Sequence, residues 1–172
     1  MITRGLTRRG VLTVLGAWAM APLSRASAEQ APGADLRFGV ITVDTSPLAR
    51  KGLSAAATAA IHEQLALALA QVFADRMAPR QSPATLVARI DSFSLASYAG
   101  DDVGAFGGPT DTDYLEGAGL VVSGGRVLST TPILSALAAS YSGAWYLPDI
   151  DARRIASITH HFAYWLRREM GL

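Results

Sequence analysis

The chain has 172 residues, of which 50% are hydrophobic, with 15 basic and 14 acidic side chains and no cysteine. The absence of thiols excludes disulfides, thiolate metal sites, haem attachment through cysteine and cysteine nucleophiles. The near balance of charge gives no electrostatic reason to bind nucleic acid or anionic lipid, so neither is expected as a primary partner.

The first 28 residues have the three parts of a secretory signal. Arginines without acidic neighbours come first, and an apolar segment of 14 residues, 10–23, follows. That segment is shorter than the about 20 residues that a membrane-spanning helix needs. "Ala26-Ser27-Ala28" is a cleavage pattern, so we expect the mature chain to begin after Ala28.

The stretch "TRRGVLT" resembles the twin-arginine (Tat) export signal, with Arg8 and Arg9 as the twin arginines. The resemblance implies export of a folded protein to the periplasm. An ordinary Sec signal that contains two arginines, or a retained anchor, is the alternative. The signal takes four arginines with it, so 11 basic and 14 acidic residues remain and the mature balance is −3.

Residues 29–35 are a short polar lead, and residues 36–172 form the single expected domain. β-branched and aromatic residues predict a strand over 36–45. Apolar residues at spacings of three and four predict a helix over 54–77, with Ser54 as its N-cap. After the signal, no apolar run is long enough to span a membrane.

A long strand is predicted over 84–98, and a shift of its apolar phase near Ile90 indicates a β-bulge. Residues 99–113 hold four glycines and a proline and are expected to form a loop. Two strands joined by Ser123-Gly124-Gly125 form a predicted hairpin. Pro132 in the second of them favours an edge strand or a bulge over a central strand. After a loop over 142–149, Asp149 is expected to cap a final helix.

This order, β-α-β-β-β-α, predicts an α/β (α+β) fold: a two-layer sandwich whose four-stranded, mostly antiparallel sheet carries two helices on one face. The stretches "FGVITVD", "VARIDSF" and "LVVSGGRVL", with the long Ala/Leu helix and the closing helix, resemble small envelope-assembly domains. These are LptE-like proteins and the periplasmic auxiliary subunits of ABC-type lipid transporters. The resemblance implies a transport or assembly auxiliary and assigns no functional residue.

Acidic residues gather around the glycine-rich loop: Asp101, Asp102, Asp111, Asp113 and Glu116. Oxygen-rich loops suit Ca²⁺, and Asp111, Asp113 and Glu116 are the metal candidates. The complete EF-hand pattern is missing, so the alternative is a solvated loop whose charges prevent edge pairing. No cofactor is expected.

No catalytic residue is assigned by the sequence, because nucleophile-elbow, Ser-x-x-Lys and phosphate-loop patterns are missing. His160 and His161 are adjacent on the final helix, so their side chains diverge and cannot readily share one metal. His62 lies on the first helix. A lone histidine acting with a distant carboxylate stays open.

Aromatic residues gather in the last loop, where Tyr141, Trp145 and Tyr146 lie close together in the sequence. Such rings either contact a partner or close the end of the sandwich. We expect a non-enzymatic periplasmic domain that binds a protein or envelope component through a strand edge, the 99–113 loop and the 141–148 loop. The alternatives are a small enzyme or ligand-binding protein that uses the acidic loop, and a calcium-stabilised structural domain.

Overall fold

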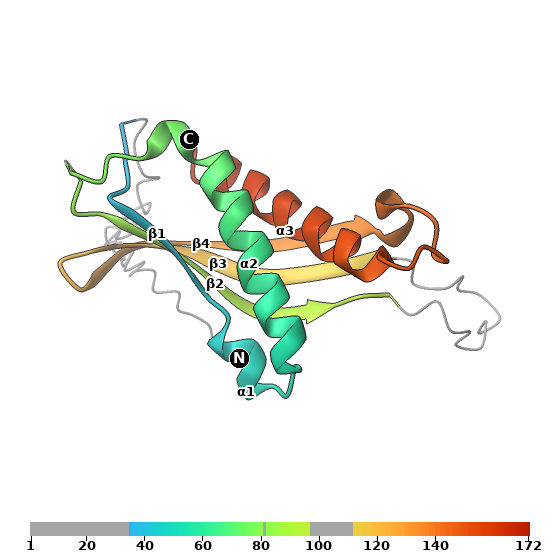
Figure 1. Cartoon of the computed structure of the whole chain (residues 1–172). Helices are drawn as coiled ribbons and strands as arrows, with labels where there is room; N and C mark the ends of the chain where they lie inside the picture. Colours follow the sequence, from blue (N-terminus) through green and yellow to red (C-terminus); the bar gives the residue numbers. More distant parts are fainter. Residues whose placement is uncertain (1–34, 81, 97–111) are drawn as a thin grey trace, which may run out of the picture.

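The computed structural model describes residues 35–80, 82–96 and 112–172, which form one sheet with helices on one of its faces (Figure 1). The expected fold class is therefore confirmed. The signal, its cleavage site and most of the acidic loop lie outside the described residues. In chain order the elements are β1 (Val40–Asp44), α1 (Ser46–Arg50), α2 (Ala55–Val72), η1 (Ala74–Arg76), β2 (Thr85–Ser94), β3 (Thr112–Ser123), β4 (Arg126–Ala138), η2 (Ala139–Ser142) and α3 (Ile150–Glu169).

The four strands lie in the spatial order β1-β2-β3-β4, so β1 and β4 are the two edges of the sheet. β1 runs parallel to β2, and the other two pairs are antiparallel. The bulge predicted near Ile90 is confirmed, because the register of β2 against β3 shifts between Ile90 and Ser92. The strand predicted over 36–45 is shorter in the structure, where β1 has five residues.

The β3–β4 hairpin follows the turn that the sequence predicts. Gly124 and Gly125 have φ angles of +57° and +75°, which side chains disfavour and glycine adopts readily. Two consecutive residues with positive φ match the right-handed twist of the paired strands. Pro132 lies in β4, an edge strand, as predicted, where its missing N–H breaks no ladder on the open side.

The helix ends agree with the sequence in one case and differ in two. Ser54 caps α2, because its Oγ accepts a hydrogen bond from the N–H of Ala57 at 3.2 Å. α2 ends at Val72 rather than at residue 77, and η1 follows it. Asp149 stands at the N-cap of α3, but the predicted cap is wrong. Its carboxylate accepts a hydrogen bond from Nε of Arg153 at 2.8 Å instead.

The hydrophobic core lies between the sheet and the two long helices, which cross the same face of the sheet (Figure 1). Side chains alternate along each strand, so one set is buried under the helices while the other faces away from them. β3 and α3 approach closely at Gly119, where an added Cβ would lie 2.4 Å from Leu166 Cδ1. No helix among the described residues is long and apolar enough to cross a membrane.

Candidate functional site

The aromatic residues of the segment from η2 to α3 lie on the surface. Tyr141, Trp145 and Tyr146 expose between 65% and 74% of their area. Trp145 and Tyr146 pack edge to face, with ring centroids 5.9 Å apart. These rings therefore do not close the end of the sandwich. They lie on the surface, where a partner could contact them.

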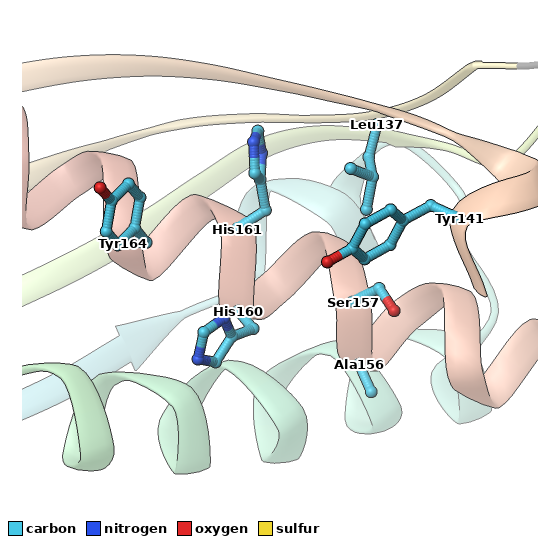
Figure 2. Close-up of a pocket in the computed structure, with 7 residues that line it drawn as sticks. All are labelled: Leu137, Tyr141, Ala156, Ser157, His160, His161 and Tyr164. Atoms are coloured by element: carbon cyan, nitrogen blue, oxygen red, sulfur yellow. The ribbon is translucent and has the colours of Figure 1, made fainter.

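A cavity of about 540 Å³ lies between this segment and α3 (Figure 2). The α3 side chains that line it recur at spacings of three and four residues, which places them on one face of the helix. Tyr141 reaches over that face from η2, as Figure 2 shows. The lining residues are Leu137, Tyr141, Ala156, Ser157, His160, His161 and Tyr164.

His161 is held at the floor of this cavity by two hydrogen bonds. Trp165 Nε1 donates to His161 Nε2 at 2.8 Å, and His161 Nδ1 lies 2.6 Å from Ser135 Oγ. An indole nitrogen is only a donor, so Nε2 must accept and the proton of the neutral ring is on Nδ1. Nδ1 therefore donates to Ser135. Burial, followed by the charge of His160, lowers the pKa of His161 below its ordinary value of 6.5.

This geometry decides what the serine–histidine pair can do chemically. A general base must accept a proton from its serine, whereas His161 donates one to Ser135. Ser135 is also fully buried on β4, where a substrate does not reach it. Both nitrogens of His161 are engaged, so the pair orients side chains and gives the cavity a rigid floor.

His160 and His161 project in different directions from α3 (Figure 2), as their adjacency in the sequence predicts. His160 is exposed at the cavity, and His62 is exposed on α2. Within the described parts of the chain, no three histidine, aspartate or glutamate side chains gather as a metal-binding set.

Asp113 lies in β3 rather than in the predicted loop, and it is 1% exposed. Its carboxylate accepts a hydrogen bond from Arg154 Nε at 2.9 Å and a second one from Arg154 Nη2. The N–H of Ala96 donates to the same carboxylate at 3.0 Å, and Arg154 Nη2 donates to the Ala96 carbonyl at 2.8 Å. The metal candidate Asp113 is thus engaged by a guanidinium and a backbone amide.

The remaining acidic candidates do not join Asp113. Glu116 lies three residues further along β3, is exposed, and projects from the opposite face of the sheet. Asp101, Asp102 and Asp111 lie outside the described residues. The structure therefore separates the two candidates that it describes.

Sequence reasoning missed Arg154, which is 2% exposed and pairs with Asp113 across 41 positions. The sequence pattern around each of the two residues indicates a buried position. Asp113 is in phase with the buried Leu115 of β3, and Arg154 is four residues before the buried Ile158 of α3. Two opposite charges in apolar phase, on elements that face each other, indicate an internal ion pair.

No protein-family model matches the chain, and no curated protein matches it. Among solved structures, a PelC dodecamer from Paraburkholderia phytofirmans is similar, with 12% identity, coverage of 81% of this chain and 93% of that chain, and a TM-score of 0.44. The hypothetical protein CT253 from Chlamydia trachomatis is similar with 11% identity, coverage of 77% and 96%, and a TM-score of 0.45. At these identities and TM-scores the similarity assigns no function to this chain.

Proposed function

We propose that this chain is an exported periplasmic domain that binds a protein or an envelope component and catalyses no reaction on it. The observation that carries the proposal is the surface position of Tyr141, Trp145 and Tyr146, of which Tyr141 lines the α3 cavity. The site comprises these three residues and the residues that line the cavity, and is called the aromatic site below.

Exposed aromatic rings suit binding because they bring a large apolar area at a low cost in side-chain entropy. A volume of about 540 Å³ lies within the range of ligand and anchor pockets. Within the part of the chain that the structure describes, no aspartate, glutamate, lysine or arginine lines the cavity. Contacts at the aromatic site would therefore come from ring faces, hydroxyl groups and the His160 imidazole, which favours an uncharged portion of the partner.

The experiment is site-specific photocrosslinking in the native compartment. A photoreactive amino acid replaces Trp145, and the matched control replaces Leu67, which is also exposed, on α2, but distant in the sequence from the aromatic site. The proposal expects one discrete adduct from position 145 and none from position 67. Equal labelling at both positions, or no adduct at 145, contradicts it.

Export is tested separately, because it depends on the "TRRGVL" stretch and not on the aromatic site. Replacing Arg8 and Arg9 with lysines should leave a folded precursor inside the cell if the signal is of the Tat type. Fractionation and protease protection measure this. Continued export of the Lys-Lys variant would identify an ordinary Sec signal and contradict the Tat part of the proposal.

A further inference from the structure

β1 is an open edge of the sheet. Among the residues that the structure describes, this strand pairs with β2 on one side and with no other strand of the sheet. The opposite edge, β4, carries Pro132, which interrupts the donors that a further strand would need. β1 has no proline and no lysine, so it lacks two common means of preventing strand addition.

The hydrogen bonds next to β1 show which of its backbone groups face outward. Phe38 faces outward, since its N–H donates to the Arg76 carbonyl at 2.9 Å and its carbonyl accepts from the N–H of Ala78 at 2.8 Å. Gly39 faces β2, because its N–H donates to the Ala84 carbonyl at 2.8 Å. Backbone groups alternate sides along a parallel strand. The N–H and carbonyl groups of Val40 and Thr42 therefore point away from β2.

The same edge is already used once by the chain itself. Residues 76–78 form an isolated parallel bridge, through Met77, with Phe38, which lies two residues before β1. The chain then turns at 79–80, so residues 76–78 do not extend this pairing alongside Val40 and Thr42. An extended segment placed there would continue an existing strand pairing.

A groove of about 520 Å³ runs beside this edge, between β1 and α2. The α2 residues that line it are His62, Ala66 and Ala70, spaced by four residues and so on one stripe of the helix. The two alanine side chains are small, which leaves room between helix and strand. The residues that line the groove are Ile41, Thr42, Val43, His62, Ala66, Ala70 and Met77.

We propose that an extended peptide segment of a partner protein adds to β1 as a fifth strand at Val40 and Thr42. Its backbone pairs with their outward N–H and carbonyl groups, and every second side chain enters the groove over Ala66 and Ala70. Those side chains are small or medium-sized and apolar, because no carboxylate, ammonium or guanidinium of the described residues lines the groove. The β1 edge and the aromatic site lie on different elements, so an experiment can contradict one of the two proposals and leave the other intact.

Amide hydrogen exchange of the free protein, followed by NMR, tests the open edge. Ile41 and Val43, which face β2, should exchange slowly, whereas Val40 and Thr42 should exchange rapidly. Slow exchange at Thr42 in the free monomer would mean that another part of the chain covers the edge and would overturn the proposal. Slow exchange that accompanies a dimer in light scattering would assign the edge to a second copy and would also overturn it.

The partner is tested with a displayed library of random linear decapeptides selected on the exported domain. Thr42→Pro removes the outward N–H and no bond to β2, so it should weaken the selected peptides about tenfold, while Thr42→Ala should not. Ala66→Arg fills the groove and should abolish binding, whereas Leu67→Arg, one position further along α2, should leave it unchanged. Thermal midpoints confirm that each variant folds.

Failure to select any peptide, or selected peptides that bind Thr42→Pro and Ala66→Arg as well as the parent, would overturn the proposal. Added protection of Val40 and Thr42 on peptide binding, with Ile41 unchanged, would support it directly.

Discussion

The two ends of α3 use the same pair of residue types in opposite surroundings. Near its start, Arg154 binds Asp113 of β3, and the two side chains are 2% and 1% exposed. Near its end, Arg167 binds Asp75 of η1 through two hydrogen bonds of 2.7 and 2.8 Å, and the side chains are 27% and 58% exposed. Both pairs connect α3 to another element, but only the first has lost its water.

The difference in surroundings sets what each pair contributes. A buried pair must offset the desolvation of two charges, so removing one partner leaves an uncompensated charge in the core. An exposed pair keeps much of its hydration and is screened by salt, so its loss has a small effect. Arg167 also donates to the carbonyls of Val72 and Leu172, which fastens the last turn of α3 without Asp75.

The largest effect is expected at Asp113. Asp113→Asn removes the buried carboxylate charge from Arg154 and leaves Asp151, an exposed carboxylate 3.5 Å from Arg154 Nη1, as its other acidic neighbour. The variant should lower the free energy of unfolding by about 3–5 kcal/mol. Chemical denaturation measures this. The matched control is the double variant Asp113→Leu with Arg154→Met, which removes both charges and should recover most of the loss. A single variant as stable as the parent would show that the pair does not stabilise the fold.

A smaller effect is expected from His161, whose neutral form the folded protein favours. Its pKa in the fold is lowered by burial and by His160, so the unfolded chain binds the proton more readily. Stability should therefore be highest above pH 6.5 and fall as the pH drops below it towards the lowered pKa of the folded state. Protonation would also direct a second N–H at the Trp165 donor.

Thermal midpoints between pH 8 and pH 5, an interval that spans the ordinary histidine pKa of about 6.5, measure this loss of stability. His161→Asn keeps a donor for Ser135 and cannot titrate, so its midpoint should fall less over the same interval. If the parent and this variant show identical pH profiles, protonation of His161 is not the cause of the loss of stability.

A still smaller effect is expected at Asp75. Its hydrogen bonds from Arg167 lower its pKa below the ordinary 3.8, so its contribution is present above pH 3.8 and is lost as the pH falls through the lowered value. Asp75→Asn should lower the thermal midpoint much less than Asp113→Asn does. The difference from the parent should disappear in about 1 M salt, where screening is strong. A salt-independent loss would mean that the pair behaves as a buried one.

The smallest effect is expected at Trp145. It is mostly exposed, so Trp145→Ala should change the free energy of unfolding by no more than about 0.5 kcal/mol, as surface substitutions do. The same variant should bind the partner identified by crosslinking more weakly than the parent does, if the aromatic site binds as proposed. A large loss of stability would instead make Trp145 a part of the fold.

Local features of this chain were predictable because neighbouring residues decide them. The glycines of the β3–β4 turn, the Ser54 cap and the bulge at Ile90 each follow from the geometry of a few consecutive residues. The cap at Asp149 failed for an equally local reason, since Arg153 one helical turn later competes for the carboxylate. α1 was missed because five residues are too few to show a helical period.

The sequence by itself determined the α/β class, the order of the long elements and the hairpin, since periodicity and turn chemistry are properties of short segments. Only the tertiary structure decided that Asp113 faces Arg154 rather than a metal, that His161 donates to Ser135, and that the rings of Tyr141, Trp145 and Tyr146 stay on the surface. Those outcomes depend on which groups meet across distant parts of the chain, and a carboxylate or an imidazole takes its role from the partner that folding places beside it.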